Sequence, residues 1–242
     1  MKFKKIVGFG DSWMWGDELL NPDLAHRSDA STALLENNQY RQQNCFLGQL
    51  GNHYQVDTVN FGIAGGSLQT TIWNYIWWRE HETQPLTDCL ILIGLTNANR
   101  LSWYNPNHQV CDNDPEWNRY VHSTWIHTNC YSSEWQNLIK QTVVSTDCKQ
   151  VNRLNYIQTV DYFAGRHSLG GTAGILQFNT LEAPCQYSAA NLVWPASCLR
   201  DMLNQQPNKS ELLAKQGHPS EQGHQLIAQR LISYIDSCII KQ

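Results

Sequence analysis

Two residues that could carry out acyl transfer stand near opposite ends of this 242-residue chain. Ser12 ends a Gly-Asp-Ser sequence near the N-terminus, and His218 precedes a proline near the C-terminus. A serine hydroxyl is a poor nucleophile until a base removes its proton, and a histidine, with an ordinary pKa of about 6.5, can remove it at neutral pH. The two residues therefore predict attack on a carbonyl group, with Ser12 as nucleophile and His218 as base.

Candidate donors for the negative charge that develops on a carbonyl oxygen lie between these two residues. Such an oxyanion needs backbone N–H groups or side-chain amides directed at it. Gly65 lies in a glycine-rich turn, and Thr96 and Asn97 follow an apolar run closely. We expect Gly65 to give a backbone N–H and either Thr96 or Asn97 to give a side-chain donor, with Asn97 slightly favoured.

The elements that must position these residues are short strands and amphipathic helices in alternation. Strands are predicted at 5–9, 56–61, 89–93, 173–178 and, more briefly, at 192–194; helices are predicted at 31–54, 68–79, 132–145, 150–167 and 220–240. The strands are apolar at successive positions, which is typical of a parallel sheet covered by helices on both faces. Reactive groups gather at the carboxyl ends of such strands, so Ser12, Gly65 and Asn97 should meet at one edge.

Taken in order, these sequence blocks resemble the SGNH (GDSL) hydrolases. Gly10-Asp11-Ser12 matches the family's nucleophile block, Asn60-x-Gly62-x-x-Gly65 matches its second block, and His218-Pro219 matches its last. The resemblance implies a flavodoxin-like three-layer α/β/α sandwich with a central parallel sheet. It also implies a serine esterase or acyl hydrolase that cleaves a carboxylic ester, and it implies no metal and no cofactor.

Two positions depart from the family's pattern. The family has an aspartate three residues before the catalytic histidine, where this chain has Lys215. Either a Ser–His dyad acts alone or an acid comes from elsewhere, and Asp201 and Glu211 are the candidates nearby in sequence. The family's Gly-x-Asn block reads Gly-Leu-Thr-Asn at 94–97, which displaces the asparagine by one residue. These departures keep an alternative open, in which a non-catalytic domain of this type binds a glycan or a protein.

The composition restricts the partners and the surroundings. The formal net charge is −4, which disfavours a nucleic-acid binder that depends on phosphate contacts. No apolar run approaches the roughly 18 residues of a membrane-spanning helix, and the N-terminus has no signal-peptide pattern. The eight cysteines include no Cys-x-x-Cys pair, so we expect reduced, mostly buried thiols in a cytoplasmic protein.

The length suits one domain over residues 1–242, with an irregular, aromatic-rich insert at about 101–130 that could cover a site. Trp13 and Trp15 flank the nucleophile and are candidates for a substrate wall. The expected partner is a small-molecule or glycan ester, with a weak preference for a small acyl group on a carbohydrate. The sequence leaves the oligomeric state open.

Overall fold

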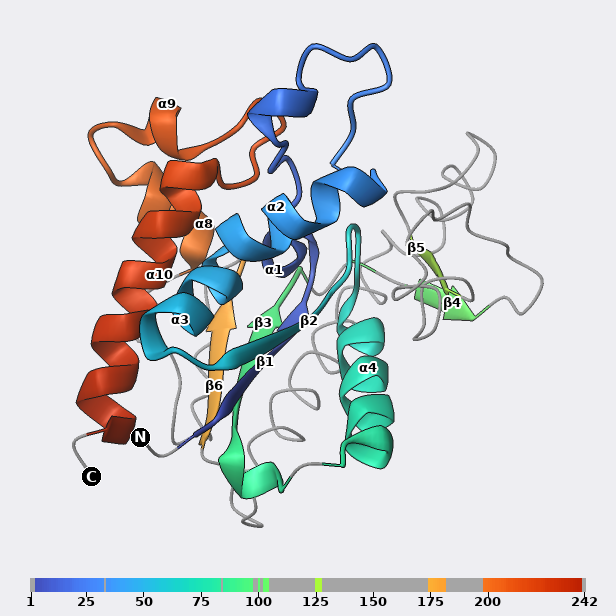
Figure 1. Ribbon diagram of the computed structural model, residues 1–242, viewed down its shortest axis with the longest axis vertical. Helices are drawn as coiled ribbons and strands as arrows, with labels where there is room; N and C mark the ends of the chain where they lie inside the picture. Colours follow the sequence, from blue (N-terminus) through green and yellow to red (C-terminus); the bar gives the residue numbers. More distant parts are fainter. Residues whose placement is uncertain are drawn as a thin grey trace, which may run out of the picture.

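The structure is a computed structural model, and it describes residues 3–32, 34–83, 85–97, 100, 102–104, 125–127, 174–181 and 198–240. Figure 1 shows the arrangement of these segments. The helices predicted at 132–145 and 150–167, the strand predicted at 192–194 and most of the insert at 101–130 lie outside the described residues.

Four parallel strands form the central sheet, in the order β2-β1-β3-β6. Their bounds are Lys5–Gly10 for β1, Asp57–Gly62 for β2, Cys89–Leu95 for β3 and Gly174–Asn179 for β6. Each strand lies within two residues of its predicted bounds, so these four predictions are confirmed. Because neighbouring strands are parallel throughout, their carboxyl ends share one edge of the sheet.

The sheet separates two hydrophobic clusters, which makes three layers. Alternate residues of one strand face opposite sides: in β1, Ile6 belongs to one cluster and Val7 to the other. On one side the cluster includes residues of α3, α8 and α10; on the other it includes residues of α4. Figure 1 shows α4 and α10 flanking the sheet from opposite sides. The predicted three-layer α/β/α sandwich with its central parallel sheet is therefore confirmed.

The helices that surround the sheet have the following bounds: α1 Ser12–Trp15, α2 Asn38–Asn44, α3 Phe46–Tyr54, α4 Leu68–His81, α8 Leu199–Asn204, α9 Lys209–Leu212 and α10 Glu221–Ile235. Short 3₁₀ turns lie at Pro22–Leu24, Leu35–Asn37 and Leu86–Asp88, and a π-helical turn at Asp236–Ile240 follows α10.

The single helix predicted over 31–54 is wrong in its extent. Cys45 has an extended backbone (φ −65°, ψ 156°) that separates α2 from α3. The first N–H of α3, on Phe46, donates to the Nδ1 of His224 across the core instead of to a carbonyl of a preceding turn. A distant side chain therefore stabilises the start of α3, which local periodicity cannot reveal.

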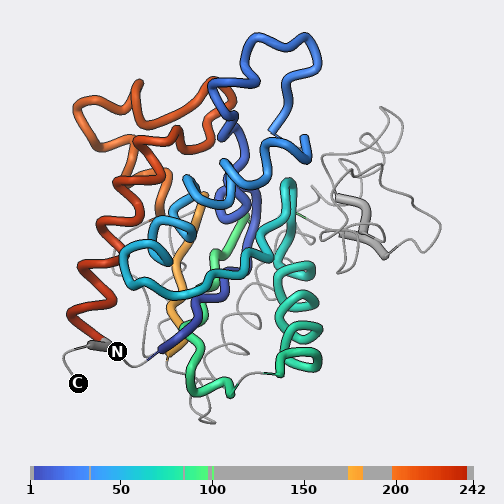
Figure 2. Tube along the Cα trace, viewed as in Figure 1, coloured from blue at the N-terminus to red at the C-terminus, as the bar shows by residue number. Residues whose placement is uncertain are grey.

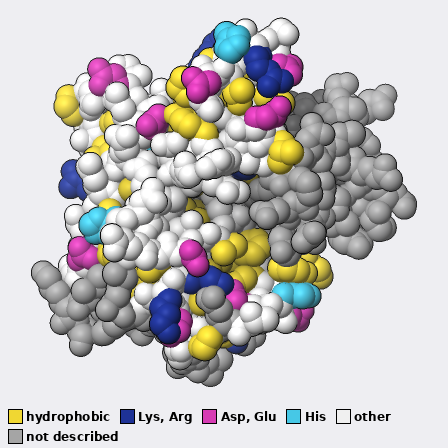
Figure 3. Space-filling view, viewed as in Figure 1, with side chains coloured by type: hydrophobic (Ala, Val, Ile, Leu, Met, Phe, Trp, Pro, Cys, Tyr) yellow, Lys and Arg dark blue, Asp and Glu magenta, His cyan; other side chains and the backbone are white. Residues whose placement is uncertain are grey.

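Two further strands lie within the predicted insert: β4, Ser102–Tyr104, pairs antiparallel with β5, Trp125–His127. In the described part of the chain, no helix is both long enough and apolar enough to cross a membrane. The four cysteines placed there are free thiols, and Cys45, Cys89 and Cys198 are buried. On the face in Figure 3, Lys and Arg side chains are scattered among acidic ones.

Candidate active site

The nucleophile candidate lies at the junction of β1 and the short helix α1. The Asp11 carboxylate accepts a hydrogen bond from the Trp13 N–H at 3.0 Å and so caps α1, with Asp11 the single residue between β1 and α1. Gly16, in the left-handed conformation (φ 86°), ends the helix. Ser12 is thereby fixed at the carboxyl edge of the sheet, where α/β proteins of this kind place their ligands.

The histidine candidate lies in a tight turn before α10. The Ala214 N–H donates to the His218 carbonyl at 2.8 Å, and Gly217 has φ 86°. Ser220 then caps α10 by accepting from the Gly223 N–H. Figure 2 shows this red-orange C-terminal segment passing beside the blue N-terminal segment. The turn brings the Nε2 of His218 to 2.9 Å from the Oγ of Ser12, across 206 positions of sequence.

Glu18 is the acidic partner of His218. Its Oε2 lies 3.0 Å from the Nδ1 of His218 and also accepts the His218 backbone N–H at 3.1 Å, while its Oε1 accepts the Gln216 N–H at 2.8 Å. A carboxylate can only accept, so Nδ1 carries the hydrogen and Nε2 is left to accept from the Ser12 hydroxyl. Serine, histidine and glutamate therefore form one hydrogen-bonded chain.

Glu18 stands in the left-handed region of backbone space (φ 66°), which is uncommon for a residue with a side chain. Such a conformation costs free energy and persists where surrounding contacts impose it. Here the Glu18 carboxylate contacts three N–H groups, two on the backbone and one on the imidazole ring, and these contacts hold its side chain in place.

The acids proposed from the sequence are not the partners of His218. Asp201 lies in the first turn of α8, and Glu211 is exposed and accepts from Asn208. Lys215 is exposed as well. Of the alternatives that the sequence leaves open, the structure has an acid from elsewhere beside His218, and that acid is neither Asp201 nor Glu211. Glu18 follows the serine by six residues and is the second of two acidic residues after the glycine that ends α1, which is the one signal for it in the sequence.

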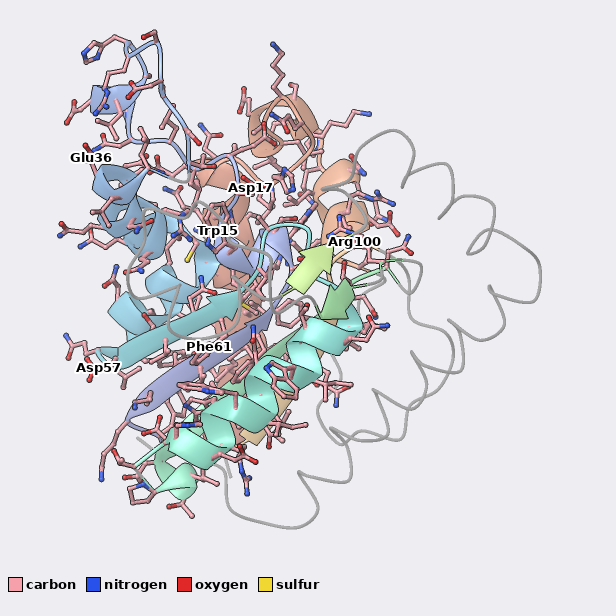
Figure 4. The ribbon with its side chains drawn as sticks, turned by 90° about the vertical axis from the view of Figure 1, so that its right-hand side faces the viewer. Trp15, Asp17, Glu36, Asp57, Phe61 and Arg100 are labelled. Carbon is pink, nitrogen blue, oxygen red and sulfur yellow. The ribbon has the colours of Figure 1, made fainter. Side chains whose placement is uncertain are left out.

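A second carboxylate, on Asp17, lies on the Ser12 side of the imidazole. Its Oδ2 is 3.7 Å from the Nε2 of His218, and its Oδ1 accepts from the Glu18 N–H and from the Thr32 hydroxyl. The Asp17 side chain is 26% exposed, more than that of Glu18 at 13%. Figure 4 shows Asp17 close to Trp15, above the sheet.

Thr96 and Asn97 have different surroundings. The Thr96 hydroxyl is buried and donates to the Oδ2 of Asp11 at 2.7 Å. The same carboxylate accepts from the Thr180 hydroxyl at 2.9 Å and has an Arg100 Nη1 at 3.5 Å. Since a hydroxyl has one hydrogen to donate, the Thr96 hydroxyl cannot donate to an oxyanion while it donates to Asp11. Asn97 is half-buried, and its part as an oxyanion donor stays a prediction.

The Gly65 turn is attached to the end of β1. The Ile63 N–H donates to the Gly10 carbonyl at 3.0 Å, and the Gly66 N–H closes the turn onto the Ile63 carbonyl at 2.9 Å. Gly65 itself has φ 73°, which a side chain would strain. These bonds place the turn against the residues that precede Ser12, as the order of sequence blocks predicts.

The two tryptophans expected to line a substrate wall are buried. Trp13 is 1% exposed and belongs to the core cluster that includes α3 and α10, which corrects its proposed place in the wall. Trp15 is 8% exposed, and the Arg41 guanidinium lies 3.9 Å from the centroid of its ring. Arg41 also donates to the Trp15 carbonyl at 2.9 Å. Both indole rings stabilise the nucleophile helix, and neither lines an open wall.

His224 is a structural neighbour of this site. It is fully buried, and its Nδ1 accepts from the Phe46 N–H at 3.2 Å. Burial, with a smaller contribution from His218, lowers the pKa of His224 to about 3, so the ring is neutral at neutral pH. In the described segments, no group of three or more His, Cys, Asp or Glu side chains could hold a metal ion.

Solved structures similar to this chain include hydrolases of several kinds. An acetylxylan esterase from Geobacillus stearothermophilus is 14% identical, covers 97% of this chain and 96% of its own length, and has a TM-score of 0.46. A lipolytic protein of the G-D-S-L family from Veillonella parvula is 15% identical, with coverages of 95% and 96% and a TM-score of 0.39. A lipase/acylhydrolase from Enterococcus faecalis is 15% identical, with coverages of 97% and 96% and a TM-score of 0.36.

No family model matches the chain, and no curated protein matches it. The fold follows from the order and the parallel register of the four strands of the central sheet. In the order of its sequence blocks and in its three-layer parallel architecture, the chain resembles the SGNH (GDSL) hydrolases.

Proposed function

We propose that the protein is a serine hydrolase that cleaves a carboxylic ester, with Ser12 as nucleophile and His218 as base. The observation that carries this proposal is the hydrogen-bonded chain from the Ser12 Oγ through both ring nitrogens of His218 to the Glu18 carboxylate, with steps of 2.9 Å and 3.0 Å. Nucleophile, base and orienting acid at such distances form the arrangement that activates a serine hydroxyl.

In the first half of the reaction, the Oγ of Ser12 bonds to the ester carbonyl carbon while its proton passes to the Nε2 of His218. The carbonyl electron pair moves onto oxygen, and the N–H groups of Ser12 and Gly65 and the amide of Asn97 are proposed as its donors. The pair then returns, the bond to the alcohol oxygen breaks, and Nε2 gives that oxygen its proton. An acyl-serine and a free alcohol result.

In the second half, water attacks the acyl-serine and gives a proton to the same Nε2. Collapse of the second tetrahedral species releases the carboxylic acid and returns the proton to the Oγ of Ser12. Glu18 accepts from the Nδ1–H throughout, so it holds the ring orientation and stabilises the imidazolium that forms in each half. The net change is ester plus water to acid plus alcohol.

The proposed substrate carries a small acyl group on a carbohydrate. The solved esterase from Geobacillus stearothermophilus that is similar to this chain acts on acetylxylan, and the proposal extends that substrate class to this site. Recognition of the carbohydrate would come from groups beside the Ser12–His218 pair.

The test is labelling with a fluorophosphonate, followed by hydrolysis of 4-nitrophenyl acetate by the wild type and by Ser12→Ala. We expect the wild type to be labelled at Ser12 and to release 4-nitrophenol, and Ser12→Ala to do neither above background. Thr32→Ser, which keeps the hydroxyl that contacts Asp17, is the matched control for a serine/threonine change nearby. A wild type that is neither labelled nor active would favour the non-catalytic, ligand-binding alternative, and an active Ser12→Ala would refute the mechanism.

A further inference from the structure

Asp17 has no part in the chain of proton transfers, yet it lies at the reacting nitrogen. Its Oδ2 is 3.7 Å from the Nε2 of His218, the same atom that faces the Oγ of Ser12. The other oxygen, Oδ1, is held by the Glu18 N–H at 3.0 Å and the Thr32 hydroxyl at 3.1 Å. The carboxylate is therefore fixed by one oxygen, and the other is directed toward the reaction centre.

The backbone reinforces this position. The Asp17 N–H and the Gly16 N–H both donate to the Ser12 carbonyl at 3.0 Å, so Asp17 is attached directly to the nucleophile residue. The Asp17 carboxylate is therefore held close to Ser12 by its own backbone. Asp17 is also the more exposed of the two acids at the imidazole, with 26% of its side chain accessible against 13% for Glu18.

The proposed chemistry defines which part of the substrate meets Asp17. Nε2 protonates the departing alcohol oxygen, which must therefore come within hydrogen-bond distance of Nε2. Because Oδ2 lies beside the same nitrogen, the carbon atoms next to the ester oxygen lie against Asp17. The carbonyl oxygen, in contrast, is assigned to the proposed Gly65 and Asn97 donors.

We propose that Asp17 is a specificity-determining residue that selects esters whose alcohol carries a vicinal hydroxyl group, on the carbon adjacent to the one that bears the ester oxygen. This inference rests on the proposed hydrolase function. An ionised carboxylate is only an acceptor, so it can bind a hydroxyl donor. An alkyl group in the same place would remove water from the carboxylate without replacing the lost hydrogen bonds, which costs free energy. The Asp17 carboxylate also repels a phosphate or carboxylate at that position. Sugars and other polyols meet this requirement, and simple alkyl alcohols do not.

The experiment compares two acetates that differ by one group: trans-2-hydroxycyclohexyl acetate and cyclohexyl acetate. Both have the same acyl group and ring, so the ratio of their kcat/KM values isolates the neighbouring hydroxyl. For the wild type we expect the hydroxylated ester to be favoured by about tenfold to a hundredfold, the range of one charge-assisted hydrogen bond. In Asp17→Ala and Asp17→Asn the ratio should fall to within about threefold of one.

Glu36→Ala is the matched control, because Glu36 is an acid with a 59% exposed side chain, and Figure 4 shows it well away from Asp17. It removes the same charge, and the substrate ratio should stay at the wild-type value. Since the ratio divides out a general loss of activity, a partly damaged variant still gives a result. The wild-type ratio is a test by itself if both Asp17 variants fail to fold.

A wild-type ratio near one, or a ratio that survives in both Asp17 variants, would overturn the inference and leave the hydrolase proposal standing. A wild type that hydrolyses neither acetate and resists fluorophosphonate would overturn the hydrolase proposal, and the inference with it. The two failures are therefore distinguishable.

Discussion

Replacing Glu18 with glutamine tests the proposed acid with almost no change of shape. The carboxylate accepts three N–H groups, from Gln216, from the His218 backbone and from the His218 ring. In Glu18→Gln, one acceptor oxygen becomes an NH₂ donor. If the amide oxygen stays at Gln216, both His218 donors lose their acceptor; if the amide flips, the Gln216 N–H loses its own.

The magnitude follows from these contacts. A hydrogen bond to a charged group contributes about 1.5–3 kcal/mol, and the 13% exposed side chain leaves little water to replace it. One or two lost bonds therefore lower the free energy of unfolding by about 2–5 kcal/mol. Removing the negative charge opposite the imidazolium costs up to about 10⁴-fold in kcat in enzymes with a triad, so we expect a loss of about 10²- to 10⁴-fold.

The assay measures kcat and KM with 4-nitrophenyl acetate, and the free energy of unfolding in urea, for the wild type and three variants. Glu18→Gln should lose kcat with KM nearly constant, and Glu18→Asp should retain part of the activity because it keeps the charge. Glu211→Gln, the same substitution at an exposed glutamate, should match the wild type. The reasoning is refuted if folded Glu18→Gln keeps kcat within about threefold of the wild type.

Two further predictions follow from the same site. Lys215→Asp, which restores the family's usual residue, should change kcat by less than about threefold, because Glu18 already occupies the Nδ1 of His218; a tenfold gain would show that no acid acts there now. Burial holds the pKa of His224 at about 3 against its ordinary 6.5, so the folded state resists a proton that the unfolded state takes up below about pH 6.5. Stability is therefore fully present above that pH, and the free energy of unfolding should fall by about 2 kcal/mol more between pH 7 and pH 5 than it does in His224→Gln, as measured by urea unfolding. An equal decrease in both proteins would contradict the assignment.

The sheet could be predicted from the sequence because strands that are buried on both faces appear as continuous apolar runs. The run Cys89–Leu95 is apolar or glycine almost throughout, and in the fold every residue of it is buried between two helical layers. Ser12 and the Gly65 turn follow apolar runs in the sequence, and in the fold they lie just beyond the ends of β1 and β2. These features depend on local composition and on the general rule for parallel sheets, and neither requires knowledge of distant contacts.

The acid could not be predicted in the same way, because its role depends on a contact across 200 positions. Glu18 needs a left-handed backbone at a residue other than glycine, and no propensity rule expects one there. For the same reason, the sequence could not predict that Trp13 is buried or that the Thr96 hydroxyl donates its hydrogen bond to Asp11. Each depends on how α1 packs against the strand ends, which the sequence does not encode locally.

The attachment of Glu18 to the nucleophile's own segment has a consequence for how sequences are surveyed. A chain with Gly-Asp-Ser near its start and Lys in place of the usual aspartate before its late histidine would be set aside as a degenerate, inactive copy. Here the carboxylate that contacts the histidine is the sixth residue after the serine, in the pattern Ser12-x-x-x-Gly16-x-Glu18. A search for that short pattern together with a late His-Pro would separate two groups of chains. In one group an acidic residue elsewhere in the sequence can contact the histidine, and in the other no such acidic residue is present.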